Sequence, residues 1–252
     1  MSDPAGHIGL VAELPSDIAA LNSIIQGLLV HSDWLTSYGL ANADYRTVSR
    51  DTLPVADRLG TILANDAQDL RTPRLPAKRA VGTCRDFALM LCSFLRSKSI
   101  SSRVRCGFAD YFSTPWEDHW VCEYWDRHAR KWFLGDAQID GLLAAKCQIE
   151  FDPVDVPRRA FMTAGEAWLA CRDGKLDPNR FGHGNVTGMW FIKINVIRDH
   201  YVLNCQETSP WDGWRAASLS KRGIGGHEVA LLDDLAARPE QQLVDVAPDW
   251  LG

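Results

Sequence analysis

The chain has 252 residues, of which 46% are hydrophobic and 23% are charged, and its formal net charge is −5. A chain of this length and composition can bury a sizeable core without metal or disulfide support, and its acidic balance argues against a general nucleic-acid binder. No stretch approaches the roughly 18 apolar residues of a membrane span, and the first residues lack the pattern of a signal peptide or anchor. We therefore expect a single domain over residues 1–252, located in the cytoplasm, without nucleic-acid or membrane partners.

Helical periodicity dominates the first part of the chain. Apolar residues recur at helical spacing over residues 15–30 and again over 53–66, and each segment is expected to form an amphipathic helix. Pro73 and Pro76 then interrupt the pattern, so the following segment should be a loop that leads to the next helix. That helix is expected over residues 84–97, with its large apolar side chains facing the core.

Strand patterns follow this helix. Residues 103–112 are expected to form a strand, and residues 119–139 resemble a hairpin. In the hairpin, two runs rich in aromatic and β-branched residues flank a polar turn at residues 126–130.

The last part of the chain is expected to be irregular over residues 141–186, apart from a helix over 164–172. Further helices are expected over residues 187–204 and 227–240. Helices followed by consecutive strands predict an α+β fold with helices packed on an antiparallel sheet, rather than alternating βαβ units.

Seven cysteines are scattered singly along the chain, and none forms a CxxC pair. Their odd number and wide spacing indicate reduced thiols rather than a disulfide framework. The missing pairs also argue against a structural zinc site. We expect neither a metal nor a cofactor.

Cys84 differs from the other cysteines because it opens a predicted helix shortly after Gly82. A thiol attacks as its thiolate, and a free thiol with a pKa of about 8.5 is mostly protonated at neutral pH. The dipole and the backbone amides of a helix N-terminus stabilise negative charge there. Gly82 lets the backbone approach a substrate carbonyl, and nearby N–H groups can receive an oxyanion. This position favours a nucleophile, which then requires a histidine base and a group that orients the base.

The predicted hairpin can supply both groups. His119 begins its first strand, and Asp136 follows its second strand. Because the chain reverses near residues 126–130, His119 and Asp136 should lie roughly opposite each other.

Three segments of the chain resemble the core of the transglutaminase-like superfamily. They are GTCRDFALMLCSFLRSKSISSRVRCGFADYF, then DHWVCEYW, then KWFLGDAQ, and together they lie within residues 80–140. The resemblance implies a papain-like α+β fold in which Cys84 is the nucleophile, His119 is the base and Asp136 orients the imidazole. Residues 141–252 would then form a family-specific extension that covers the catalytic core.

The resemblance implies thiol-dependent acyl transfer or hydrolysis at an amide or thioester carbonyl, through an acyl-enzyme intermediate. The expected partner is a peptide, an amide or an acyl-thioester small molecule. The sequence makes no prediction of the oligomeric state.

Four further residues near these segments have expected roles. Trp116 and Trp120 flank His119, and either of them can line a substrate cleft or pack in the core. Asp86 should cap the first helical turn, where an acidic group interacts favourably with the helix dipole. Arg103 is expected to form an ion pair.

Three alternatives remain open at this point. The first is an amide-forming acyltransferase of secondary metabolism, and the second is a non-catalytic binding protein that retains the fold. The third is a zinc site made of Cys84, His119 and Cys122. It is disfavoured because residues three apart on a strand point to opposite faces.

Overall fold

The structure is a computed structural model that describes residues 1–41, 53–112, 115–207 and 224–241. Its residue contacts group into two compact units. The first unit combines residues 1–103 with 121–156, and the second combines residues 104–120 with 157–252.

Two strands run across the boundary of these units. They are β3 (Ser102–Ala109) and β4 (Trp116–Asp126), and each begins in one unit and ends in the other. The contacts therefore do not divide the chain near residue 140, where the extension was expected to begin. That the two units make a single domain stays a prediction.

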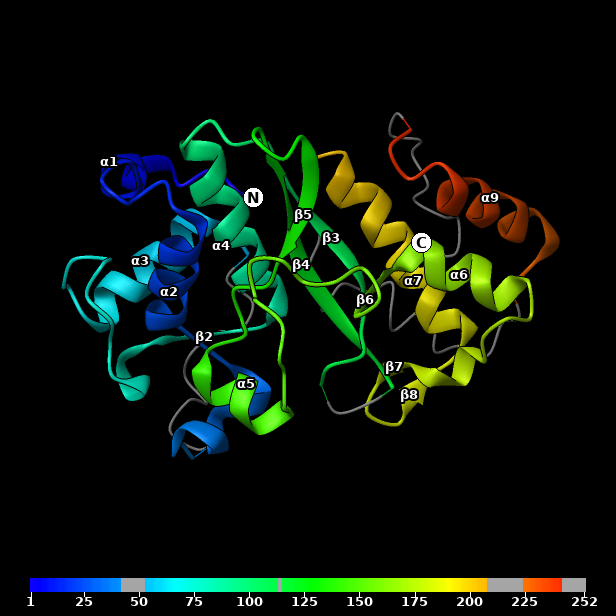
Figure 1. Cartoon of the computed structure of the whole chain (residues 1–252), viewed down its shortest axis with the longest axis horizontal. Coiled ribbons are helices and arrows are strands. Elements are labelled where there is room, and N and C mark those ends of the chain that lie inside the picture. The colour runs from blue at the N-terminus through cyan, green and yellow to red at the C-terminus, as the bar shows by residue number, and fades with distance from the viewer. Residues whose placement is uncertain (42–52, 113–114, 208–223, 242–252) are drawn as a thin grey trace. The chain divides into compact units, whose positions relative to one another are not determined.

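Three helices of the first unit lie where the sequence predicted helices. They are α2 (Ile18–Leu28), α3 (Val55–Asn65) and α4 (Cys84–Ser97), and both α2 and α3 pack against α4 (Figure 1). The short helix α1 (Ile8–Ala12) precedes them and was not predicted. The start of α2 is fixed by Asp17, whose side chain accepts a hydrogen bond of 2.8 Å from the Ala20 N–H. The apolar faces of the three longer helices are buried and form the core of this unit.

A short parallel ribbon lies just before α4 in this unit and was not predicted. Strand β1 (Leu29–His31) pairs in parallel with β2 (Ala80–Gly82), and the register places His31 beside Gly82. Each strand has only three residues, which is too short for a periodic pattern to show in the sequence. The ribbon matters for the site because β2 leads directly into α4.

The main sheet has six strands in the order β6-β3-β4-β7-β8, with β5 also pairing with β4. The remaining strands are β5 (Lys131–Gly135), β6 (Phe161–Thr163), β7 (Phe181–His183) and β8 (Val186–Thr187). Strands β3 and β6, β4 and β5, and β7 and β8 are antiparallel, as expected, but β4 and β7 are parallel. The sheet is therefore mixed rather than wholly antiparallel.

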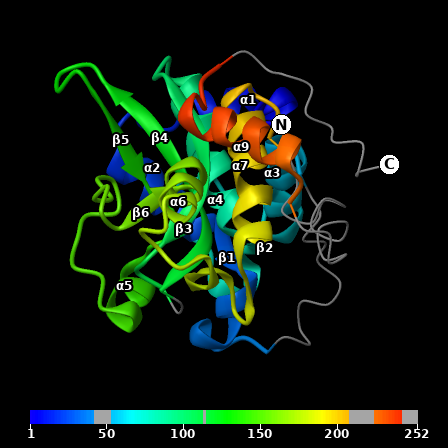
Figure 2. The same ribbon diagram turned by 90° about the vertical axis from the view of Figure 1, so that its right-hand side faces the viewer.

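The predicted hairpin is formed by β4 and β5 (Figure 2). Its ladder runs from the pair Cys122 and Gly135 to the pair Asp126 and Lys131. This register differs by two residues from the one that would set His119 opposite Asp136. A shift of two residues preserves the side of the sheet on which each side chain lies, because side chains alternate with a period of two.

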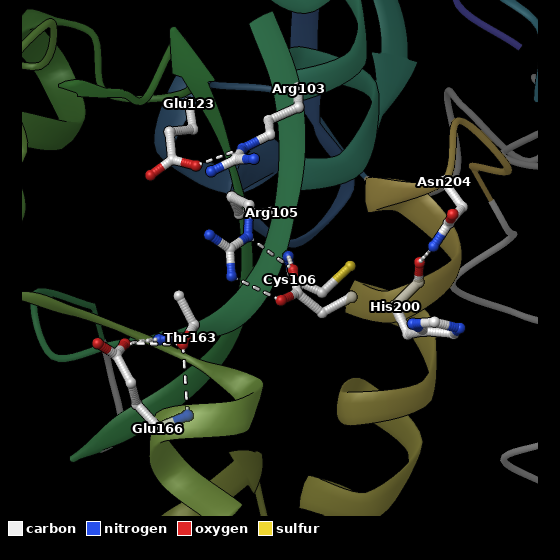
Figure 3. A network of polar contacts seen from close by, with 9 residues as sticks. Arg103, Arg105, Cys106, Glu123, Thr163, Glu166, His200 and Asn204 are labelled. Atoms are coloured by element: carbon white, nitrogen blue, oxygen red, sulfur yellow. Dashed lines mark hydrogen bonds and ion pairs between the residues drawn. The ribbon is translucent and has the colours of Figure 1, made fainter. Parts of the chain in front are cut away.

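In the second unit, α6 (Ala164–Arg172), α7 (Met189–Leu203) and α9 (Gly226–Ala237) pack on one another. Helices α6 and α7 lie within segments that the sequence predicted to be helical, and α9 begins one residue before its predicted segment. The start of α6 is closed by Glu166, whose carboxylate accepts hydrogen bonds from the Thr163 N–H and hydroxyl at 2.8 and 2.7 Å (Figure 3). Large apolar side chains from these helices and from β7 make its core, among them Trp168, Phe181 and Phe191.

Helix α7 buries polar side chains as well as apolar ones. Asp199 is 2% exposed and accepts two hydrogen bonds from the Arg105 guanidinium, at 3.0 and 2.7 Å. It also accepts the N–H of Cys106 at 2.9 Å (Figure 3). A buried charge costs free energy unless it is paired in this way, so these bonds fix α7 on β3.

The segment over 141–186, expected to be irregular outside one helix, contains more structure than predicted. It holds the short helix α5 (Gly141–Cys147) of the first unit and the strands β6 to β8. Short 3₁₀ turns complete the described elements, at Ala5–His7, Ser32–Tyr38, Pro76–Lys78 and Pro178–Arg180. No helix among the described residues combines the length and the apolar character needed to cross a bilayer.

Candidate active site

Cys84 is the first residue of α4, as the sequence predicted. Its side chain is partly exposed, whereas Cys92, Cys106 and Cys122 are buried. Burial raises the pKa of the Cys106 and Cys122 thiols well above the usual value. None of the seven cysteines, all of which the structure describes, forms a disulfide. Cys84 therefore differs from these three buried thiols in both exposure and position.

The start of α4 is closed by Asp86, and the expected capping role is confirmed. The Asp86 carboxylate accepts the N–H of Thr83 at 2.8 Å and its hydroxyl at 3.3 Å. Gly82 makes this approach possible, because a Cβ at residue 82 would lie 3.0 Å from the Asp86 Oδ2 atom. The absence of a side chain at residue 82 thus leaves room for the Asp86 carboxylate that caps the helix.

Two buried arginines surround the same carboxylate. Arg58 Nη2 lies 3.2 Å and Arg85 Nη1 lies 3.5 Å from Asp86 Oδ1, and each of these two arginines is 1% exposed. Backbone carbonyls also hold them, since Arg58 donates to the Val81 oxygen and Arg85 to the Leu53 oxygen. Two guanidinium groups thus lie beside the carboxylate that caps α4. The dipole of the helix favours an anion at its start.

Asp136 follows β5 in the same unit and is 2% exposed. Its Oδ1 atom accepts the N–H of Gln138 at 3.0 Å, and its own N–H donates to the Pro153 oxygen at 2.7 Å. The carboxylate is therefore held by a turn, and its second oxygen adds acceptor capacity that can serve a histidine. The adjacent Gly135 lies against α4, because a Cβ at residue 135 would be 3.2 Å from Leu91 Cδ2.

His119 lies on the part of β4 that belongs to the second unit and is 2% exposed. Two aromatic rings meet the imidazole edge to face: its centroid lies 5.8 Å from that of Tyr111 and 4.9 Å from that of Phe112. Next to it, Asp118 accepts a hydrogen bond of 2.7 Å from Asn195 of α7. The two rings thus contact the imidazole, and the bond to Asn195 holds the residue before it.

The two tryptophans proposed to line a cleft differ in their surroundings. Trp120 is 1% exposed, and this burial supports its alternative role as a core residue. Trp116 is partly exposed, and its ring stacks on that of Phe181 with centroids 5.7 Å apart. Trp116 is the more accessible of the two tryptophans.

Arg103 forms the ion pair that the sequence predicted. Its Nε atom lies 2.6 Å from a carboxylate oxygen of Glu123, which is 2% exposed (Figure 3). The guanidinium also lies over the Trp132 ring, 4.4 Å from its centroid. Arg103 therefore contacts both strands of the hairpin, through Glu123 of β4 and Trp132 of β5.

Sequence reasoning missed three residues at the start of α4: His31, Arg58 and Arg85. His31 reaches Gly82 through the β1–β2 pairing, and its ring stacks on Phe87 with centroids 6.5 Å apart. His31 and Arg58 could not be predicted as neighbours of Cys84, because they lie far from it along the chain and no local pattern connects them to it. Arg85 follows Cys84 directly, but its burial could not be predicted, because arginine side chains are mostly exposed.

Comparison with known families gives one match. Residues 62–137 match the family model of the transglutaminase-like superfamily. This segment of the chain is similar to the transglutaminase-like core. Neither the curated proteins nor the solved structures gave a match. The matched segment of this core includes Cys84, His119 and Asp136, and the α+β fold implied by the resemblance is confirmed.

Metal binding finds no support in the part of the chain that the structure describes. No group of three or more His, Cys, Asp or Glu side chains there is placed to hold an ion.

Proposed function

We propose that this protein is an enzyme that transfers or hydrolyses acyl groups at an amide or thioester carbonyl, with Cys84 as its nucleophile. The observation that carries the proposal is the start of α4 within the matched core. There, a partly exposed thiol follows a closed helix cap that is surrounded by two buried arginines. The superfamily to which this core is related is generally enzymatic.

The proposed reaction has two steps. In the first, His119 takes the thiol proton, and the Cys84 sulfur forms a bond to the carbonyl carbon. The tetrahedral intermediate then collapses, its bond to the leaving amine or thiol breaks, and His119 returns the proton to that group. In the second step, water or an amine attacks the thioester, gives its proton to His119 and releases Cys84.

Asp136 is proposed to hold the imidazole of His119 in the productive tautomer and to stabilise its protonated form. The backbone N–H groups at the start of α4 are proposed to stabilise the oxyanion. The substrate would be a peptide, an amide or an acyl-thioester. If an amine rather than water accepts the acyl group, the enzyme would be an amide-forming acyltransferase. We also propose a cytoplasmic location, in keeping with seven cysteines outside disulfides.

Acylation by 4-nitrophenyl acetate tests the proposal without a known substrate. Intact mass and peptide mapping should find an acetyl group on Cys84 in the wild type. Cys205→Ser is the matched control, because Cys205 is an exposed thiol far along the chain. The control should keep the acetyl group on Cys84, while Cys84→Ala should lose both the label and the release of 4-nitrophenolate.

His119→Ala should slow acylation by roughly 10²- to 10⁴-fold, as expected for the loss of a general base. A Cys84→Ala variant that releases 4-nitrophenolate as fast as the wild type would contradict the proposal. It would instead favour a non-catalytic binding protein with this fold.

A further inference from the structure

His31 has an unusual position for a histidine outside the proposed triad. It is the last residue of β1 and pairs with Gly82, two residues before Cys84. Its side chain is 8% exposed. The parallel ribbon thus brings a second histidine to the start of the helix that carries the proposed nucleophile.

The protonation of the His31 ring is fixed by a hydrogen bond to the backbone. The Nδ1 atom accepts the N–H of Asp33 at 3.1 Å and thereby caps the 3₁₀ turn that follows β1. An imidazole nitrogen that accepts a hydrogen bond carries no proton, so the proton of the neutral ring is on Nε2. The neutral ring of His31 therefore presents its N–H at Nε2.

The ring lies on the side of α4 that bears Cys84. It stacks on the Phe87 ring with an interplanar angle of 25°. Phe87 comes three residues after Cys84 in the helix, and residues three apart lie on the same face. The pairing with Gly82 and the stacking on Phe87 therefore place the imidazole beside the first turn of the helix.

We propose that His31 is a catalytic residue whose Nε2–H donates a hydrogen bond to the oxyanion formed when Cys84 attacks a carbonyl. This inference rests on the proposed function. No proton is transferred to or from His31: the negative oxygen of the tetrahedral intermediate accepts one bond from Nε2–H and one from a backbone N–H at the start of α4. A donor fixed in advance is effective here because it needs no reorganisation during the reaction.

Two reactions of the same thiol separate this role from others. Alkylation by iodoacetamide is a displacement at a saturated carbon and forms no oxyanion. Acylation by 4-nitrophenyl acetate passes through a tetrahedral oxyanion. Both rates are measured at Cys84 by mass spectrometry in the full-length Cys205→Ser protein and in three variants made in that background: His31→Leu, His31→Gln and His128→Leu.

His31→Leu should lower the acylation rate by about 100-fold, the effect of removing one oxyanion donor, and should leave the alkylation rate nearly unchanged. His31→Gln retains an N–H donor and should stay within about 10-fold of the parent rate. His128, in the exposed turn of the hairpin, serves as the matched histidine control, and His128→Leu should change neither rate.

Two results would overturn the role of His31. One is a His31→Leu variant that acylates within about threefold of its parent. The other is an equal loss of both rates in that variant, because His31 would then act on the thiol or on the fold. If the parent protein itself is alkylated but never acylated at Cys84, the proposed function fails instead, so the two failures are distinguishable.

Discussion

At the scale of single residues, the first turn of α4 is a buried electrostatic cluster rather than an ordinary helix start. Asp86, Arg58 and Arg85 are each 5% exposed or less, and the carboxylate caps the helix that begins with Cys84. The position of Cys84 and the cap at Asp86 could be predicted, because both follow from local rules of helix ends. Arg58 could not be predicted, because it reaches Asp86 from another helix.

Asp86→Asn should reveal how strongly this cluster stabilises the fold. Asparagine keeps the size and an acceptor for the Thr83 N–H but removes the negative charge that lies beside the buried Arg58 and Arg85 guanidinium groups. We expect the free energy of unfolding to fall by about 3 kcal/mol, the usual effect of removing one partner from a buried ion pair. Urea denaturation followed by tryptophan fluorescence measures the change.

Asp69→Asn is the matched control, because Asp69 forms an exposed ion pair with Arg71 at 2.8 Å. Exposed pairs contribute little to stability, so the urea midpoint of the control should stay near that of the wild type. An Asp86→Asn midpoint equal to that of the control would show that the buried cluster is not a stabilising feature.

At the scale of elements, the longer helices and the hairpin could be predicted, and the shortest strands could not. The helix over 84–97 and the helix over 164–172 have the predicted bounds because their apolar periodicity and caps agree. The strands β1, β2, β6, β7 and β8 have two or three residues each, so their pairing depends on tertiary contacts. The parallel pairing of β4 with β7 could not be predicted for the same reason.

Gly107→Ala tests the contact between two of these elements in the second unit. Gly107 of β3 pairs with Thr163 of β6, and a Cβ at residue 107 would lie 2.2 Å from the backbone oxygen of Met162. The two strands must therefore move apart to accept a methyl group. We expect a loss of about 2 kcal/mol in the free energy of unfolding, measured by urea denaturation.

Gly141→Ala provides the matched control for this glycine substitution. Gly141 is the first residue of α5, and a Cβ there would meet no atom within 4 Å. Alanine at this helix position should leave the stability unchanged or raise it by about 0.5 kcal/mol. If Gly107→Ala is as stable as Gly141→Ala, the close approach of β3 and β6 is wrong.

At the scale of the whole molecule, the proposed mechanism draws on both compact units. Cys84 and Asp136 belong to the first and His119 to the second. The sequence could predict the α+β class and the segment that bears these residues, because motif and periodicity are local. It could not predict the interleaved units, since their boundary follows contacts between residues far apart in the chain.

If His119 and Asp136 activate Cys84 as we propose, the alkylation rate of this thiol must depend on pH differently from that of an ordinary thiol. The rate of reaction with iodoacetamide is measured at each cysteine by mass spectrometry in the intact chain. The exposed Cys205 serves as an internal reference thiol, and Asp136→Asn as the variant that keeps size and removes charge. A thiolate paired with an imidazolium titrates well below an ordinary thiol, whose pKa is about 8.5.

We expect Cys84 to react rapidly already at about pH 6.5, where an ordinary thiol is mostly protonated. Between about pH 6.5 and 8 its rate should not climb tenfold per unit, and Asp136→Asn should shift the profile toward that of the reference thiol. A single inflection for Cys84 near pH 8.5, unchanged in Asp136→Asn, would instead show that no ion pair activates the thiol.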